Sequence, residues 1–259
     1  GINYGTTEKV SSSEAFEEAV TANKEHIVID LNEDVTYDVA PWNNNAMGGT
    51  KTDTITINGN GHTITFNQLD SDWDNITTGE TGAKLNIINA HLTNSGHNDS
   101  AWNRHDLNFA CDVSLVDVTT DKAIALKAGA TLKNVTISDA NTSDTYAIWI
   151  RPKGQTVSLE DVVIDMLDCS DGRGIKIDEE YLSEEEKGKV TLNVTDTVFK
   201  TEEKSAILVK STKGADITLK NVDITEAAAD TTNPVWVDEA SSAYADLVTV
   251  TGGTKIVEP

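Results

Sequence analysis

Hydrophobic and polar positions alternate in short runs along most of the chain, and one six-residue pattern recurs. Its order is apolar, polar, Asn or Asp, apolar, polar, apolar, as in LKNVTI at residues 132–137. Consecutive copies start 17 to 35 residues apart, at Ile57, Ile87, Leu115, Leu132, Leu159, Val194 and Leu219. This variable spacing is typical of a supersecondary unit that repeats with loops of different length.

A second short run lies between the copies: AIAL, AIWI, GIKI, AILV and PVWV, from residues 123, 147, 174, 206 and 234. Strict alternation directs every second side chain to one face of a strand. That face is apolar in each run: Ile124 and Leu126, Ile148 and Ile150, Ile175 and Ile177, Ile207 and Val209, Val235 and Val237. One unit has almost no core by itself, so we expect the units to stack and bury a continuous apolar column.

The Asn or Asp inside each copy indicates a corner between two strands. Left-handed backbone geometry is tolerated best by Gly, Asn and Asp, and Asn is otherwise depleted in strands. The predicted corners are Asn89, Asp117, Asn134, Asp161, Asp196 and Asn221, with Gly59 in the same place in the first copy. Stacked corner side chains could also hydrogen-bond to one another.

With these corners, the chain resembles the pectate-lyase-like right-handed parallel β-helix superfamily over about residues 55–250. The preceding segment SSEAFEEAVTANKEHIVIDL is similar to the helix and first strand that open such domains. The resemblance implies an all-β, single-stranded right-handed parallel β-helix with an N-terminal capping helix. It also implies a bacterial protein that is secreted or at the cell surface. Because no Pro/Gly/Ser-rich linker divides the chain, we predict a single domain over residues 1–259.

The clearest helical pattern lies in the lead-in at residues 11–24, and predicts a helix from Ser13 to about Asn23. Ser12 or Ser13 can cap its N-terminus, and an apolar stripe follows at Ala15, Phe16, Ala19 and Val20. We expect this helix to cover the first end of the stack. Residues 179–189 are a weaker helical candidate and are expected to form a charged surface excursion.

The chain is strongly acidic, with 43 Asp and Glu against 20 Lys and Arg and a formal net charge of -23. The charge is spread along the sequence, which favours solubility and repulsion between copies, so we expect a monomer. Nucleic acid is excluded as a partner because phosphate binding needs clustered Lys and Arg. No apolar run is long enough for a transmembrane helix, so membrane insertion is not expected.

The side chains that point outward from the alternating runs form the candidate binding site. Neighbouring strands lie about 4.8 Å apart, so these side chains would make a dense patch. Trp rings beside charged groups can hold a sugar ring and its hydroxyls. The predicted ligand-binding residues are Trp149, Arg151, Lys176, Asp178, Trp236 and Asp238. The alternative is that they pack beneath a neighbouring loop.

The segment SDGRGIKID resembles part of the charged grip of carbohydrate lyases and hydrolases of the superfamily. It supplies the catalytic candidates Asp171, Arg173, Lys176 and Asp178. The paired-Asp segment and companion His motif of the polygalacturonase-like hydrolases are missing.

A calcium site is suggested by alternating carboxylates at Asp70, Asp72 and Asp74, spaced as in the start of an EF-hand loop. The match ends at Asn75, where that loop has Gly, so an ordinary Asp-rich turn is the alternative. We expect no required cofactor, with Ca²⁺ as the one candidate. Cys111 and Cys169 are either free buried thiols or a disulfide.

Three functions are compatible with these features. The leading hypothesis is a non-catalytic carbohydrate-binding or adhesin-like module whose partner is a polysaccharide or surface glycan. The second is a polysaccharide lyase or glycoside hydrolase acting on an acidic polysaccharide. The third is a structural stalk domain.

Overall fold

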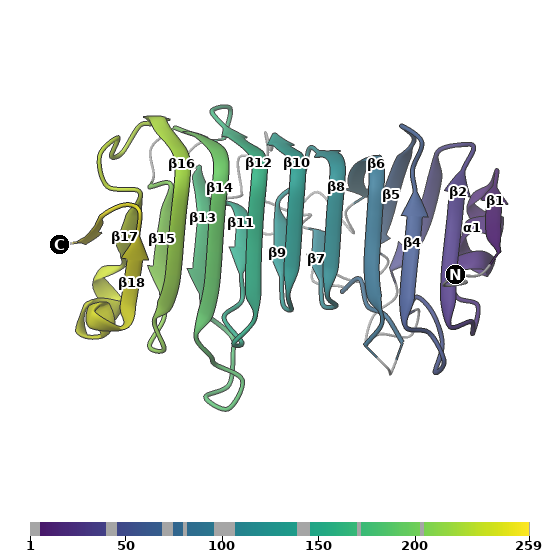
Figure 1. The fold of residues 1–259 in the computed structure, drawn as a ribbon, viewed down its shortest axis with the longest axis horizontal. Helices are drawn as coiled ribbons and strands as arrows, with labels where there is room; N and C mark the ends of the chain where they lie inside the picture. The colour runs from purple at the N-terminus through teal and green to yellow at the C-terminus, as the bar shows by residue number, and fades with distance from the viewer. Residues whose placement is uncertain are drawn as a thin grey trace.

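The structure is a computed structural model of the 259-residue chain, drawn in Figure 1. It describes residues 6–39, 46–68, 75–79, 82–95, 107–138, 146–169, 172–202 and 205–258. Within these ranges the protein is all-β, with most residues in two long sheets. Every strand pairing in the same ranges is parallel.

The larger sheet runs along the whole long axis of the molecule, from β1 to β18 (Figure 1). Within the described ranges it has twelve strands, and β3 and β5 pair beside the main path. The strands are β1 (Thr7–Val10), β2 (His26–Leu31), β3 (Val35–Val39), β4 (Thr54–Asn58), β5 (Thr63–Gln68), β6 (Lys84–Ser95), β8 (Val113–Thr120), β10 (Ala130–Ser138), β12 (Thr156–Met166), β14 (Val190–Thr201), β16 (Ala215–Ala227) and β18 (Val248–Thr251).

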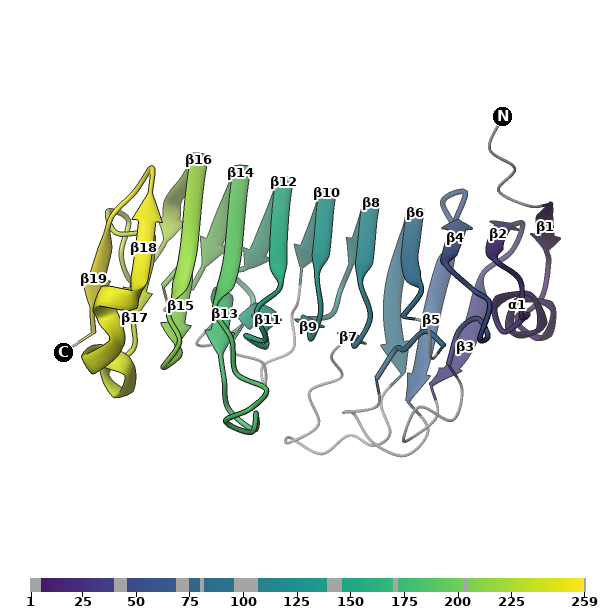
Figure 2. The same ribbon diagram turned by 60° about the horizontal axis from the view of Figure 1, so that its bottom comes forward.

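The smaller sheet has seven strands in the described part of the chain, in the order β7-β9-β11-β13-β15-β17-β19. They are β7 (Leu107–Phe109), β9 (Ile124–Leu126), β11 (Tyr146–Ile150), β13 (Arg173–Asp178), β15 (Ile207–Lys210), β17 (Val235–Val237) and β19 (Lys255–Val257). From β6 onward the chain alternates between the two sheets, and each strand pairs with its equivalent in the next repeat (Figures 1 and 2). Strand pairing reaches from Thr7 to Val257, and is therefore more extensive than the predicted range of about 55–250.

The predicted corners are present in the backbone. All six Asn and Asp positions have positive φ, between 49° and 56°. In the first copy the left-handed residues are Asn60 and Gly61, with φ of 51° and 81°, so the prediction of left-handed geometry at Gly59 was wrong. Gly59 is required for a different reason, since a Cβ there would lie 2.5 Å from the carbonyl oxygen of Asn89.

Corner side chains are hydrogen-bonded between neighbouring repeats at two steps of the larger sheet. Asn134 Nδ2 donates to Asp117 Oδ1 at 2.8 Å, and Asn221 Nδ2 donates to Asp196 Oδ1 at 2.7 Å. The amide of each Asn therefore satisfies the carboxylate of the preceding corner, and the predicted bonding between stacked corners is confirmed at these steps.

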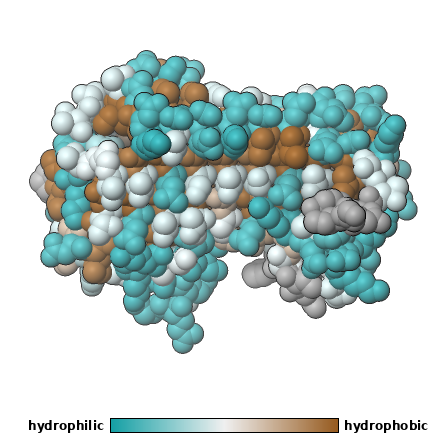
Figure 3. All heavy atoms as spheres, in the orientation of Figure 1, coloured by the Kyte–Doolittle hydropathy of each residue, from teal (hydrophilic) through white to brown (hydrophobic). Residues whose placement is uncertain are grey.

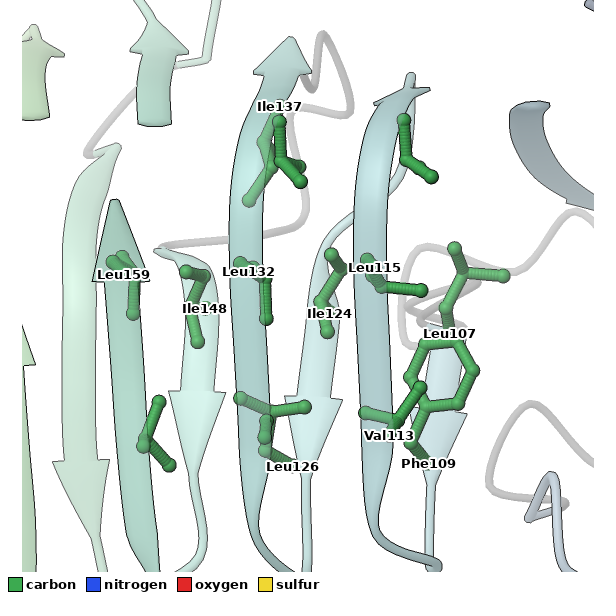
Figure 4. Close-up of a cluster of buried hydrophobic side chains, with 14 of the residues drawn as sticks. Leu107, Phe109, Val113, Leu115, Ile124, Leu126, Leu132, Ile137, Ile148 and Leu159 are labelled. Carbon is green, nitrogen blue, oxygen red and sulfur yellow. The ribbon is translucent and has the colours of Figure 1, made fainter. Parts of the chain in front are cut away.

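The core is a set of apolar columns between the two sheets. Leu115, Leu132 and Leu159 are register partners along the larger sheet, and Ile124 and Ile148 along the smaller one (Figure 4). All five are at most 1% exposed. The predicted inward face of the alternating runs is fully buried in each repeat, which confirms the period-2 assignment.

The outer face of the larger sheet is seen in Figure 3, where a hydrophobic band follows the long axis between more hydrophilic margins. Some outward positions here are half-buried, as at the register partners Ile88 and Val116, and others, such as Lys133, are exposed. Regular cross-strand pairs of this kind stabilise a flat sheet surface.

The N-terminal end is covered by the helix α1 (Ser13–Val20), as predicted, and the N-cap is Ser12, whose Oγ accepts from the Ala15 amide at 3.1 Å. The helix ends at Val20, before the predicted Asn23, and its C-cap Thr21 donates through Oγ1 to the Glu17 carbonyl at 2.6 Å. Its Phe16 begins a buried series of edge-to-face ring contacts into the stack: Phe16–Tyr37 at 6.1 Å, Tyr37–Phe66 at 6.4 Å and Phe66–Phe109 at 6.3 Å.

Residues 179–189 form turns between β13 and β14 instead of the weaker predicted helix. The segment protrudes from the body in Figure 1 and is hydrophilic in Figure 3. Its charges are paired: Lys187 Nζ lies 3.1 Å from Glu184 and 3.6 Å from Glu179, and Lys213 Nζ lies 3.2 Å from Glu184. The predicted excursion is present, and these ion pairs connect it to the body.

Candidate functional site

The outer face of the smaller sheet aligns three of the predicted site residues, Trp149, Lys176 and Trp236, in one column. Strand register gives the column in the order Asn108, Ala125, Trp149, Lys176, Leu208, Trp236 and Ile256. A neighbouring column pairs Asp178 with Lys210. The predicted alignment is therefore confirmed, and the exposure of each side chain decides which of them can meet a ligand.

The Trp149 side of this face is closed. Trp149 is only 1% exposed, and its Nε1 donates to the Asp178 carbonyl at 3.0 Å. The Arg151 guanidinium carbon and Lys176 Nζ lie 4.6 and 4.4 Å from the ring centroid, and Lys176 also lies 4.6 Å from the Tyr146 ring. Cation–π contacts of this kind stabilise a packed cluster. The prediction of an open Trp149 ring is wrong, because side chains of the neighbouring strand and turn cover it.

Lys176 and Asp178 form a buried ion pair, with Nζ 3.4 Å from Oδ2. The residues are 6% and 3% exposed, and Arg151 is 7% exposed. Asp178 also accepts from the Glu180 amide at 2.9 Å, and Arg151 Nη2 donates to the Glu180 carbonyl at 2.8 Å. Their predicted role in an open patch is contradicted by this burial, and their contacts connect the sheet to the turn that follows β13.

The Trp236 side of the same face is open. A cleft of about 780 Å³ lies there, lined by Arg173, Trp236, Asp238, Glu239, Ala240 and Glu258. We call this the Trp236 cleft. Leu208, the register partner of Trp236, is 1% exposed. Three predicted site residues therefore meet at one open surface: Arg173, Trp236 and Asp238.

The Trp236 ring is held in place by the turn at residues 230–233. Its Nε1 donates to Asp230 Oδ2 at 3.2 Å, and Asn233 Nδ2 donates to the same oxygen at 2.8 Å. Burial opposes ionisation of Asp230, but hydrogen bonds from Asn233, Thr232 and Trp236 outweigh it and lower the pKa of the carboxyl. The turn therefore holds the ring through an ionised carboxylate.

Arg173 is the cationic side of the cleft. Among the described residues no carboxylate lies within ion-pair distance of its guanidinium, and its Nε is buried without a hydrogen-bond partner. Asp238 uses Oδ2 to accept from the Ala240 amide at 2.9 Å, which caps the 3₁₀ segment η2 (Glu239–Leu247). The cleft thus combines an aromatic face, one guanidinium and three carboxylates, a set that favours hydroxyl-rich ligands over polyanions.

A cluster of three cations, Lys127, Arg151 and Lys153, lies next to Trp149 and was not predicted from the sequence. Lys127 donates to Asn75 Oδ1, and burial together with nearby Arg151 and Lys153 lowers the pKa of Lys127 to about 8. Spacing alone could not reveal it, because Lys127 approaches Arg151 and Lys153 only through the pairing of β9 with β11.

The remaining chemical candidates give no site within the described ranges. Asp70, Asp72, Asp74 and Asp171 lie outside those ranges, and no group of three metal-binding side chains is found within them. Cys111 and Cys169 are buried thiols that form no disulfide, and burial raises the pKa of the Cys111 thiol to about 12. No helix in the described part of the chain has the length and apolarity to span a membrane.

Sequence reasoning missed Glu239 and Glu258, which border the cleft, and Asp230, which supports the Trp. The run DTTN at residues 230–233 is an Asx-turn signature that could have indicated an ordered support. Glu258 has no such local signal, because only the stacking of β19 on β17 brings it to the cleft.

Comparison with known proteins found no matching family model, no matching curated protein and no matching solved structure. The Trp236 cleft is therefore the feature of this protein that indicates a function.

Proposed function

We propose that the two parallel sheets belong to a right-handed parallel β-helix. The chain alternates between the sheets and returns to pair in parallel with its own preceding repeat. Crossovers between parallel strands of one sheet are right-handed in nearly all proteins, which supports this hand.

We further propose that the protein is a non-catalytic carbohydrate-binding module, and that its binding site is the Trp236 cleft. The observation that carries the proposal is an open cleft lined by a fixed Trp ring and by an Arg that has no carboxylate partner in the described ranges. A sugar ring can stack on the indole while its hydroxyls bond with the guanidinium and carboxylates. A secreted or cell-surface location agrees with such a partner.

An enzyme built on the predicted catalytic residues has weaker support. Lys176 and Asp178 are buried against each other, and of the described candidates only Arg173 borders the open cleft. A general acid or base must reach the substrate atom from which it takes, or to which it gives, a proton.

The test is retention of plant, host and bacterial polysaccharides by purified protein, with and without calcium, with the chain length of each polymer recorded. We expect retention of an uncharged polysaccharide without shortening. Trp236→Ala should abolish retention, and Arg173→Met should weaken it. Tyr244→Ala is the matched control, because Tyr244 is 40% exposed and is not among the residues lining the cleft.

Folding of each variant is checked by its thermal transition, so that lost retention is not caused by unfolding. Equal retention by Trp236→Ala would show that the cleft is not the binding site. A polymer that shortens would refute the non-catalytic role and return attention to Arg173.

A further inference from the structure

Tyr181 is an exposed aromatic residue in the turn after β13. Tyr181 is 77% exposed, the largest value among the exposed large hydrophobic residues of the described chain. Its φ is +67°, a left-handed conformation that is a genuine outlier for a bulky residue. Neither burial nor backbone preference therefore accounts for a tyrosine at this position.

The turn itself would suit a different residue. The Leu182 amide donates to the Glu179 carbonyl at 3.0 Å, so residues 179–182 form a β-turn with Tyr181 as its third residue. A positive φ at that position is ordinarily supplied by Gly or Asn. An aromatic ring is present where the fold alone favours a small or polar side chain.

Hydrogen bonds hold the turn that carries the Tyr181 ring. The Glu179 carboxylate accepts from the Thr212 amide at 3.0 Å and from its hydroxyl at 3.1 Å. On the other side of the turn, Glu180 is bonded through its carbonyl to Arg151 and through its amide to Asp178. These bonds hold both residues that precede Tyr181.

A second cleft, of about 330 Å³, lies beside Tyr181, and its lining includes Lys187, Lys210, Thr212 and Ala240. Ala240 also lines the Trp236 cleft, so the two clefts adjoin. Two aromatic residues, Trp236 and Tyr181, therefore border two adjoining clefts that share Ala240.

We infer that Tyr181 is a second aromatic contact of an extended site for a linear, uncharged oligosaccharide. The ligand would run from the Trp236 cleft past Ala240 to the Tyr181 ring. This inference rests on the proposed function. Carboxylates outnumber cations along the two clefts and the whole chain carries -23, so a polyanionic glycan would be repelled.

The experiment is calorimetric titration with cello-, xylo- and manno-oligosaccharides, each as a disaccharide and a hexasaccharide. The native protein should bind a hexasaccharide more tightly than its disaccharide. Tyr181→Asn removes the ring and keeps a residue that tolerates positive φ. It should weaken hexasaccharide binding by roughly three- to tenfold, the effect of one aromatic contact, and leave the disaccharide unchanged.

The control Tyr244→Asn should change neither affinity, and Trp236→Ala should weaken both. A hexasaccharide that binds no better than the disaccharide, or equally well to Tyr181→Asn, would overturn the role of Tyr181 and leave the Trp236 cleft intact. Binding unaffected by Trp236→Ala, or no binding of any of these sugars, would overturn the extended site together with the proposed function.

Discussion

The corner at Asn134 gives a sharp test of how the repeats are built. Asn134 has φ of 51° and donates from Nδ2 to Asp117 Oδ1 at 2.8 Å. Asn134→Ala loses this exposed hydrogen bond, worth about 0.5–1.5 kcal/mol. Alanine also lacks the short polar side chain whose local hydrogen bonds make the left-handed region accessible to Asn, which costs roughly 1–2 kcal/mol. The free energy of unfolding should fall by about 1.5–3.5 kcal/mol.

Asn134→Gly separates the two contributions. Glycine loses the same hydrogen bond but accepts the positive φ, and its added cost is the entropy of the unfolded chain, roughly 0.5–1 kcal/mol. Gly should therefore be more stable than Ala at position 134. At Lys133, an exposed neighbour in the same strand without positive φ, the order should be reversed, with Ala more stable than Gly.

The assay is urea unfolding of the four variants, compared at midpoints with equal slopes. If Gly is more stable than Ala at position 134 and Ala is more stable than Gly at position 133, the left-handed backbone of the corner explains the difference. If Ala is more stable than Gly at both positions, the left-handed geometry does not contribute to stability and the reasoning fails.

Three further predictions concern stability and reactivity. Lys127→Met should stabilise the fold at pH 7 by about 1–2 kcal/mol, less than the full pKa shift implies because the side chain is partly exposed. Between pH 8 and 10.5, the ordinary pKa of lysine, Lys127 keeps its proton only in the unfolded chain, so the stability of the native protein rises with pH and the advantage of Met shrinks. A gain that does not change with pH would contradict the burial of a charged Lys127 as its cause. Phe66→Ala should lower the free energy of unfolding by about 3–5 kcal/mol, because the ring lies in the middle of the buried aromatic series, and a loss below about 1 kcal/mol in urea unfolding would refute that placement. Cys111 and Cys169 should resist iodoacetamide in the native protein at pH 8, and both should react in denaturant without reductant, with the number of labels counted by mass spectrometry. Rapid labelling of the native protein would contradict their burial, and a disulfide would contradict their assignment as thiols.

The sequence by itself determined the features that depend on local geometry. Left-handed backbone is accessible to Asn and Asp, so the corner at Asn134 could be predicted from its residue type. Alternation with a period of two assigned Ile124 and Ile148 to the core, because successive side chains of a strand point to opposite faces. The start of α1 followed from the hydroxyl at Ser12 in the same way.

The tertiary structure decided which outward side chains remain open. Trp149 and Trp236 occupy equivalent positions in their strands, yet Trp236 borders an open cleft whereas Trp149 is 1% exposed. The side chains of Arg151 and Lys176 cover Trp149, whereas the next register partner of Trp236 is Ile256, which is itself 42% exposed near the end of the stack. Exposure on a stacked sheet depends on the neighbours in space, and strand register connects residues that lie far apart in the sequence.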